Sequence, residues 1–517
     1  MIDQAASRRR FLQFVAGSPL FAGSLAAFAG EGPAPGVKLP DPIMWAPLTT
    51  GNLIKTPRDA INVFDFEPVC RVNVPPAHFG YMASGIDDEV TLRANREGFA
   101  KFQLRPRRLV DVSKVDMSTD ILGVRYDSPI IIAPVGGQQS FHPEGEIAVA
   151  RAAKAGNHLQ ILSTATNTGV EDVAAARGAP LWYQLYATNK WDVAKAMVAR
   201  AEKTGCLAVA VTVDRSGGRN QETLFRLQGS DTRDCNGCHE RGSLATNLKR
   251  RAMYQGLDIS GLTHTQSSNM SWDFLKRLRD ATRMKILLKG ILAHEDAVLA
   301  AEAGMDAIIV SNHGGRSEDS GRSTIDALPE IVEAVGGRMP ILIDSGFRRG
   351  TDIVKALCLG ASAVCVGRPY VWGLGAFGQA GVERVLELLR IELYAAMQQG
   401  RRPEHQASRA RHGAPGGRLR WLRDLGQVAE RPDERDGRFL FVQVEYLAVR
   451  APDARLGARD RAGRELRRQS ADRTDASGAE LQALLHAGRQ RERGRTGEHQ
   501  CGGDEQAAHD IPWNHGR

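Results

Sequence analysis

The residues best suited to chemistry lie at positions 311–319, which read Ser-Asn-His-Gly-Gly-Arg-Ser-Glu-Asp. They follow an apolar run at 307–310 that is typical of a buried parallel strand. His313 can accept a proton near neutral pH, and Arg316 can hold a carboxylate through two parallel hydrogen bonds. A base beside a carboxylate-binding group suits the oxidation of a 2-hydroxy acid, although a His-Gly-Gly turn can also be purely structural.

Short apolar runs recur through the middle of the chain, with helix-compatible segments such as 145–153 and 294–301 between them. Eight such runs in series predict an α/β fold, a (β/α)8 TIM barrel. An open doubly wound sheet is the alternative, but it usually has fewer strands. The runs are Pro129–Ala133, Leu159–Ser163, Leu181–Tyr186, Leu207–Val213, Ile286–Lys289, Ala307–Ser311, Ile341–Asp344 and Ala363–Gly367.

Polar residues and glycines follow these runs, where barrel enzymes carry their active sites. Glycines beside arginines after the seventh and eighth runs predict a phosphate-binding site, because their backbone N–H groups are accessible. The fourth connection, from about 215 to 273, is much longer than a usual loop and predicts a lid or an added flap. The residues at the strand ends include Gln184, Tyr186, Thr212, Asp214, Lys289, Asp344, Arg348, Gly367 and Arg368.

The two ends of the chain differ in composition from its middle. Residues 1–29 contain Arg8 and Arg9 before a weakly apolar stretch, so they resemble a twin-arginine export signal and predict a periplasmic location, with membrane association as an option. Residues 30–75 are expected to form a linker and an N-terminal arm, and 76–399 the catalytic barrel. No other segment is apolar for long enough to predict a membrane span.

The formal charge of +8 is concentrated at these ends. Residues 1–29 carry +2 and residues 401–517 carry +5, which leaves +1 for the middle and argues against a nucleic-acid partner. The segment 400–517 has 23 arginines and no lysine. It is either a disordered extension or the product of a shifted reading frame, and no function is assigned to it.

A series of ordered motifs carries a resemblance that spans roughly residues 60–398. In this order they resemble the FMN-dependent 2-hydroxy acid dehydrogenase and oxidase family, which includes L-lactate dehydrogenase, glycolate oxidase, lactate oxidase and mandelate dehydrogenase. The motifs are Gly80-Tyr81-Met82-Ala83-Ser84-Gly85, Arg105-Pro106-Arg107, Ala133-Pro134-Val135-Gly136, His142-Pro143-Glu144-Gly145-Glu146, Gln184-Leu185-Tyr186, Thr212-Val213-Asp214, Leu288-Lys289-Gly290, Ser311-Asn312-His313-Gly314-Gly315-Arg316 and Gly367-Arg368-Pro369.

The resemblance implies roles for individual residues. His313 is the expected base, Asp214 its partner and Arg316 the group that binds the substrate carboxylate. Tyr81 and Tyr186 are expected to position the carboxylate and the hydroxyl, and no metal is expected. The residues expected to hold FMN are Val135, Gly136, Ser163, Gln184, Thr212, Lys289 and Ser311 around the ring, and Asp344, Arg348, Gly367 and Arg368 around the ribityl chain and phosphate.

The resemblance also implies a reaction, the FMN-dependent oxidation of an L-2-hydroxy acid to the 2-keto acid. Either His313 accepts the hydroxyl proton as hydride passes to flavin N5, or the α-proton leaves first. Electrons then pass to a quinone, a cytochrome or oxygen, and the protein is expected to be a homo-oligomer, a tetramer. The alternatives are a flavin-binding remnant without turnover and another FMN barrel, such as a type 2 isopentenyl diphosphate isomerase.

The sequence departs from the family pattern in three places. The family's second substrate arginine has no fixed counterpart in 214–222, where Arg219 is the best candidate. Ala165 replaces a tryptophan of glycolate oxidase, which predicts a substrate of lactate size or larger. Cys235 and Cys238 with His239 have the spacing of a haem c attachment site, and a disulfide, a zinc-type clip or unlinked thiols are the alternatives.

Overall fold

The computed structural model describes residues 53–106, 108–215, 217–232, 244–400 and 429–430. Three predictions lie outside these residues: the export signal at 1–29, the motif at 235–239, and the tail apart from residues 400 and 429–430.

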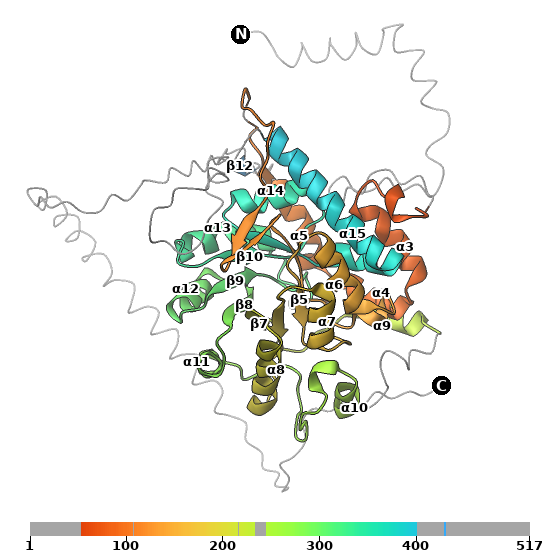
Figure 1. Cartoon of the computed structure of the whole chain (residues 1–517), viewed down its shortest axis with the longest axis vertical. Helices are drawn as coiled ribbons and strands as arrows, with labels where there is room; N and C mark the ends of the chain where they lie inside the picture. The colour runs from red at the N-terminus through yellow and green to blue at the C-terminus, as the bar shows by residue number, and fades with distance from the viewer. Residues whose placement is uncertain (1–52, 107, 216, 233–243, 401–428, 431–517) are drawn as a thin grey trace, which may run out of the picture. The chain divides into compact units, whose positions relative to one another are not determined.

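Eight parallel strands form the centre of the fold, and they match the eight apolar runs (Figure 1). Neighbours pair in chain order from β5 to β11, and β11 then pairs with β4. A parallel bridge between Ile132 and Gln160 closes the ring, which confirms the (β/α)8 barrel and excludes the open sheet. The strands are β4 (Ile130–Ile132), β5 (Ile161–Ser163), β6 (Trp182–Leu185), β7 (Ala208–Thr212), β8 (Lys285–Ile291), β9 (Ala307–Val310), β10 (Ile341–Ile343) and β11 (Ala363–Val366).

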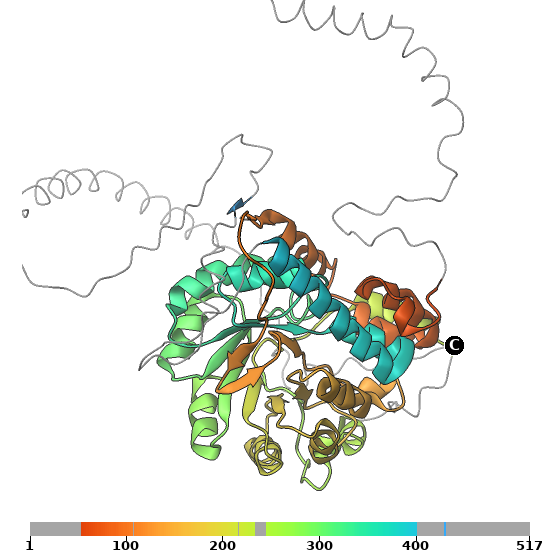
Figure 2. The ribbon, with the colours of Figure 1, turned by 45° about the horizontal axis from the view of Figure 1, so that its top comes forward.

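A helix follows each barrel strand, and these helices surround the sheet (Figure 2). The long fourth connection also contains α9 (Glu222–Ser230), α10 (Leu244–Lys249) and the short 3-10 helix η6 (Ala252–Tyr254), which we call the flap. The barrel helices are α6 (Gly145–Ala155), α7 (Val170–Arg177), α8 (Trp191–Lys203), α11 (Trp272–Ala281), α12 (His294–Glu302), α13 (Thr324–Val335), α14 (Gly350–Cys358) and α15 (Arg368–Gln399).

The alternation of side chains along the barrel strands determines where the polar residues point. The buried cluster inside the barrel contains Ile161, Trp182, Ala210, Leu287, Ile309 and Leu342. The residues between them, such as Leu162 and Tyr183, belong to the cluster under the helices. Two residues after each of these interior side chains, the next side chain on the same face also points inward, at the C-terminal end of the barrel. Those positions are Ser163, Gln184, Thr212, Lys289, Ser311 and Asp344.

A hairpin that the sequence analysis did not predict covers the other end of the barrel. It consists of β2 (Thr119–Ile121) and β3 (Val124–Tyr126), and Ile121 and Tyr126 pack in the interior cluster. Leu122 and Gly123 both have positive φ, of 50° and 86°, as a two-residue hairpin loop of type I′ requires.

The segment before the barrel is largely helical. Its α3 packs against α15, where the rings of Phe66 and Phe377 lie 6.1 Å apart. Among the residues that the structure describes, none of the helices has the length and apolar character needed to cross a membrane. The remaining elements are η2 (Pro57–Asp59), η3 (Val63–Asp65), α3 (Phe66–Asn73), α4 (Pro76–Ala83), α5 (Val90–Glu97), η4 (Gly98–Lys101), η5 (Gln138–Ser140) and β1 (Phe102–Gln103), which pairs with β12 (Ala429–Glu430).

Candidate active site

A layer of polar side chains forms the upper end of the barrel interior. Gln184 connects two of its members: its Oε1 accepts a hydrogen bond from Ser163 at 2.9 Å, and its Nε2 donates to Thr212 at 2.8 Å. Lys289 Nζ donates to Ser311 Oγ at 2.9 Å and lies 3.3 Å from Asp344. Lys289 is only 3% exposed, and the nearby carboxylates outweigh the effect of burial and raise its pKa. The site therefore holds a buried positive charge.

His313 lies above this layer on a strained turn. Its φ is 59°, a left-handed value that is unusual for a residue with a side chain, and Gly314 and Gly315 continue the turn at 72° and 74°. A Cβ on Gly315 would lie 2.6 Å from Leu92 Cα, so this turn needs glycine. The turn presents the imidazole to the cavity.

The surroundings of His313 determine its protonation and its tautomer. Nδ1 lies 3.0 Å from Asp214 Oδ1, while Nε2 lies 3.3 Å from the Tyr186 hydroxyl and 3.4 Å from Arg215 Nη1. Burial lowers the pKa of His313 to about 3; Asp214 opposes this shift, whereas Lys289 and Arg215 add to it. Arginine can only donate, so Nε2 carries the lone pair and Nδ1–H donates to Asp214. His313 is therefore a neutral base with its lone pair in the site.

Asp214 is ionised in this arrangement. Burial would raise its pKa, but its interaction with the His313 ring and the charge of Lys289 lower it. The carboxylate can therefore stabilise the imidazolium that forms when His313 accepts a proton.

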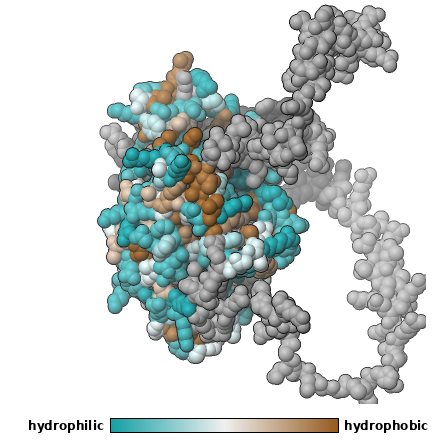
Figure 3. Space-filling model, turned by 90° about the vertical axis from the view of Figure 1, so that its right-hand side faces the viewer, coloured by the Kyte–Doolittle hydropathy of each residue, from teal (hydrophilic) through white to brown (hydrophobic). Residues whose placement is uncertain are grey.

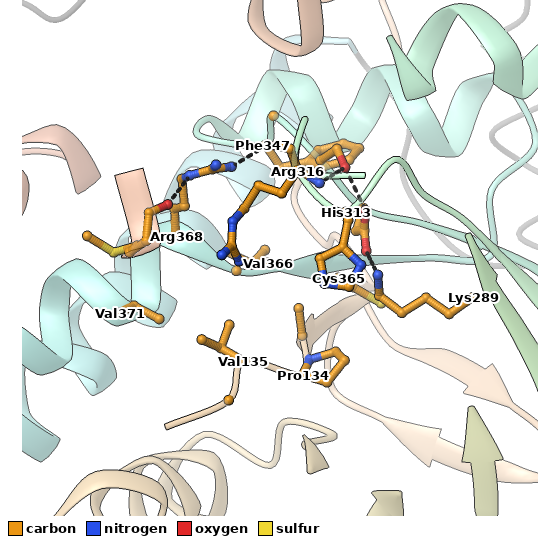
Figure 4. Close-up of a pocket in the computed structure, with 18 of the residues that line it drawn as sticks. Pro134, Val135, Lys289, His313, Arg316, Phe347, Cys365, Val366, Arg368 and Val371 are labelled. Atoms are coloured by element: carbon orange, nitrogen blue, oxygen red, sulfur yellow. Dashed lines mark hydrogen bonds and ion pairs between the residues drawn. The ribbon is translucent and has the colours of Figure 1, made fainter. Parts of the chain in front are cut away.

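Arg316 projects into the same cavity as His313 (Figure 4). Its Nε and Nη2 are buried and have no hydrogen-bond partner among the described residues, and its guanidinium lies 4.5 Å from the centroid of the Tyr81 ring. Burial would raise the pKa of Tyr81, but Arg316, Arg215 and Arg251 lower it. Two unpartnered donors on one guanidinium match the two oxygens of a carboxylate.

The structure places two arginines from the loop after β7 at the site. Burial lowers the pKa of Arg219, the predicted residue, to about 10, and the charges of Arg215 and Arg316 add to this shift. Arg215, which the sequence analysis did not assign, is the one in contact with His313 and stacks over the Tyr186 ring at 5.5 Å. Its position directly after Asp214 was the available signal.

The other side of the cavity is built from the loops after β10 and β11. Arg348 is buried, and its pKa is lowered well below the usual value by burial and by the charges of Arg96 and Arg368. A Cβ placed on Gly367 would have its nearest neighbour at 3.9 Å, so the backbone there borders open space. An accessible backbone beside a buried, poorly compensated cation fits a phosphate group.

Arg368 differs from its predicted role in one respect. Its three guanidinium nitrogens donate to the carbonyl oxygens of Met82, Gly314 and Ser84 at 2.8, 2.8 and 3.1 Å. It lines the cavity, but these bonds chiefly join the end of α4 to the turn at Gly314.

Most of the predicted site residues surround one cavity. Those that line it are Tyr81, Val135, Gly136, Tyr186, Lys289, His313, Arg316, Asp344, Arg348, Gly367 and Arg368. The other predicted residues do not line it. Asp214 lies behind His313, and Arg219 is placed only by its charge interactions. The polar layer contains the rest, namely Ser163, Gln184, Thr212 and Ser311. Figure 4 shows Pro134 and Val135 across the cavity from His313 and Arg316.

A barrel that combines a phosphate site after its last two strands with a buried cation, a neutral base and a carboxylate-binding arginine is equipped as a flavin-dependent oxidoreductase. Comparison with known proteins gives the particular family. Residues 70–408 match the sequence model of the FMN-dependent dehydrogenases, and the chain belongs to that family. Its cofactor is FMN, and the cavity lined by Lys289, Gly367 and Arg348 has the positive charge and accessible backbone that suit that molecule.

The relatives are oxidases of 2-hydroxy acids. The chain is 40% identical over 339 residues to the peroxisomal (S)-2-hydroxyacid oxidase GLO3 of Arabidopsis thaliana, which covers 65% of this chain and 92% of that protein. It is also 40% identical over 349 residues to glycolate oxidase 1 of Oryza sativa subsp. indica, covering 65% and 90%. A crystal structure of mandelate oxidase superposes with a TM-score of 0.59 at 36% identity and covers 66% of this chain and 94% of that one.

The predicted periplasmic location is wrong in the light of these relatives. Relatives with 39–42% identity from Arabidopsis thaliana and Oryza sativa are named as peroxisomal enzymes. The prediction rested on Arg8, Arg9 and the apolar stretch after them, all of which lie outside the described residues. An arginine pair before small apolar residues is a short pattern that also arises without an export function.

Proposed function

We propose that the protein oxidises an L-2-hydroxy acid of lactate size or larger to the 2-keto acid and passes the electrons to oxygen. One observation carries the proposal: His313 and Arg316 line one cavity, His313 Nε2 carries a lone pair, and two guanidinium nitrogens of Arg316 have no hydrogen-bond partner among the described residues. The hydroxyl and the carboxylate of a 2-hydroxy acid are adjacent, so a single small substrate can meet both groups. Oxygen as acceptor is supported by the relatives, which are named as oxidases.

The residues of the site divide the work of the reaction. Arg316 binds the substrate carboxylate, and Tyr81 lies against the guanidinium and restricts its position. His313 Nε2 accepts the hydroxyl proton, and Asp214 stabilises the imidazolium that results. The Tyr186 hydroxyl, 3.3 Å from Nε2, positions the substrate hydroxyl. The chemistry that FMN supplies when bound is the acceptance of hydride from the α-carbon.

The remaining predicted residues are assigned to the cofactor. Lys289 would supply a fixed cation to the bound cofactor, and Val135 and Gly136 in the loop after β4 would help to hold its ring. The polar layer would contribute to the same site, and Arg348 with the backbone at Gly367 would hold the phosphate.

Anaerobic mixing of the purified flavoprotein with a panel of L-2-hydroxy acids tests this function. We expect rapid loss of flavin colour in the parent and a rate about 100- to 10,000-fold lower in His313→Gln, with FMN still bound. His294→Gln is the control, because His294 lies on α12 with its side chain half exposed. Rapid bleaching in His313→Gln would refute the assigned base. Return of the colour on admission of air reports oxygen as acceptor.

We also propose that the protein is a homo-oligomer. On the face shown in Figure 3, apolar residues gather in a strip across an otherwise largely hydrophilic surface. Exposed apolar side chains of the N-terminal segment, Ile61 at 82% and Val72 at 66%, support association. Light scattering on the purified protein measures the state, and a mass of one chain would contradict the proposal.

A further inference from the structure

A second cavity lies next to the catalytic one. Tyr81 and Tyr186 line both cavities, so the two are neighbours across these rings. Ala165 lines the second cavity, which is where the small side chain was predicted to leave room for a longer substrate. The flap supplies much of the remaining wall, including Leu248 and Tyr254.

The second cavity is strongly basic. Arg215, Arg250 and Arg251 line it, and among the described lining residues there is no aspartate or glutamate. Arg251 Nη1 donates to the carbonyl oxygen of Ala165 at 2.9 Å, which holds this guanidinium at the wall. Arg215 Nε is buried without a hydrogen-bond partner among the described residues. The nearby carboxylate of Asp214 accepts a hydrogen bond from His313 and also interacts with Arg215, so one carboxylate faces several arginines.

The arginines outnumber what a monocarboxylic substrate needs. The two unpartnered donors of Arg316 suffice for one carboxylate, and burial together with the charges of Arg215 and Arg316 lowers the pKa of Arg219. Arg215 and Arg251 also line the second cavity. The neutral side chain of a monocarboxylic substrate would fill that cavity without bringing a negative charge to these two arginines. A negative group in that cavity would remove the imbalance.

We propose that the substrate carries a second carboxylate at the far end of its side chain, so that the preferred substrates are 2-hydroxy dicarboxylic acids. The α-carboxylate binds Arg316, and the distal carboxylate lies between Arg251 and Arg215 in the second cavity. This inference rests on the proposed function, since it names the substrate class of that same site.

Matched substrates test the proposal on the holoenzyme. We compare kcat/KM for (S)-2-hydroxyglutarate and (S)-malate with that for (S)-2-hydroxyhexanoate, in which an ethyl group replaces the distal carboxylate of hydroxyglutarate. One of the dicarboxylates should exceed the neutral acid about 10- to 100-fold, as expected for a charge-assisted hydrogen bond. Equal or higher kcat/KM for the neutral acid would overturn the proposal.

Substitution of Arg251 locates the effect. Arg251→Met should lower kcat/KM for the dicarboxylate about tenfold or more and leave the neutral acid within about twofold, and Arg251→Lys should recover part of the loss. Arg226→Met is the control, because Arg226 is an exposed arginine of the same flap that pairs with Glu222. An equal loss for both substrates in Arg251→Met would mean that Arg251 only supports the structure, and would refute its role.

A binding measurement separates this proposal from the function on which it rests. Unreactive 2-oxoglutarate and 2-oxohexanoate are titrated against the flavin absorbance of the parent and of Arg251→Met. If 2-oxoglutarate binds more tightly than 2-oxohexanoate in the parent but not in Arg251→Met, the result supports the role of the basic cavity. If the neutral hydroxy acids bleach the flavin and the dicarboxylates do not, the proposed function stands and this inference fails; if none of the hydroxy acids bleaches it, the proposed function fails.

Discussion

His313 combines three features that a residue rarely has together: a left-handed backbone, a largely buried side chain among charged groups and a fixed tautomer. The charges around it act in opposite directions. Asp214 favours the imidazolium, whereas Lys289 and Arg215 disfavour it. The ring is thus held neutral before the reaction, and the carboxylate is in place to stabilise the charge that the reaction creates.

The Asp214 carboxylate should matter for rate more than for binding. In Asp214→Asn the side chain can donate to Nδ1 and favour the tautomer with its proton on Nε2, where the base is needed. We expect kcat to fall at least about 100-fold with little change in the Kd of a 2-keto acid. Stopped-flow reduction and titration of the flavin absorbance measure the two quantities. A change in Kd as large as the change in kcat would indicate a general disturbance of the site.

The pH dependence should show the lowered pKa of His313. With a pKa of about 3 in the folded protein, the base is unprotonated throughout the neutral and mildly acidic range. The acid limb of kcat/KM should therefore lie far below pH ~6.5, the usual value for histidine. The same shift affects stability: the unfolded chain takes up this proton below pH ~6.5 while the folded chain does not until about 3, so stability falls over that window as pH decreases. An acid limb of kcat/KM near pH 6 that tracks His313 would contradict the buried neutral state.

Much of the residue-level site could be predicted because the functional groups come directly after strands. His313, Lys289 and Asp214 follow apolar runs, and their types suffice to suggest their chemistry. The role of Arg215 was missed, because a loop after a strand has no periodicity to show which of its arginines turns back toward the site. The carbonyl contacts of Arg368 come from chain segments far apart in sequence, which no local pattern reveals.

At the scale of elements, the close approach of β8 to the end of β7 fixes the position of Asp214. Gly290 in β8 has a φ of 114°, and a Cβ there would lie 2.6 Å from Asp214 Cβ. The bulge between Lys289 and Ile291 marks the same place in the ladder. A glycine that is not itself a lining residue of the cavity thus supports the base through its partner.

Gly290→Ala should therefore lower kcat in addition to stability. Its control is Gly304→Ala, where φ is 70° but no atom of the described residues lies within 4 Å of the new Cβ. Both variants should lose about 1–2 kcal/mol of stability from the left-handed backbone. Only Gly290→Ala should also reduce kcat, because it displaces Asp214. Thermal unfolding and flavin reduction measure the two effects, and equal kcat in the two variants would refute the supporting role of Gly290.

The barrel strands were predictable as elements because each is a short buried run between helical segments. The hairpin at Leu122–Gly123 was missed, since strands of three residues give almost no periodicity. Helix α3 was hidden for another reason. It lies in a segment rich in proline and glycine, and its helix is stabilised by packing on α15, a partner some 300 residues later in the chain.

At the scale of the whole molecule, both cavities belong to one part of the chain. Every described residue that lines the two cavities lies between Tyr81 and Val371, and the family match ends at residue 408. Among the described residues, the last member of the core cluster under the helices is Met397 of α15. The arginine-rich composition that begins after residue 400 therefore lies beyond all the side chains to which we assign a role.

A chain that ends after residue 430 should then retain FMN and turnover. It keeps β12 and its pairing with β1, so no described backbone hydrogen bond is lost. We expect the same ratio of FMN to protein and a kcat/KM within about twofold of the full chain, because a change without effect on the site leaves the activation free energy unaltered. Absorbance spectra and anaerobic flavin reduction measure both. A chain that ends after residue 360 is the negative control, since it lacks β11 and α15 and cannot close the barrel. Loss of FMN from the chain ending at 430 would show that residues 431–517 contribute to the catalytic unit after all.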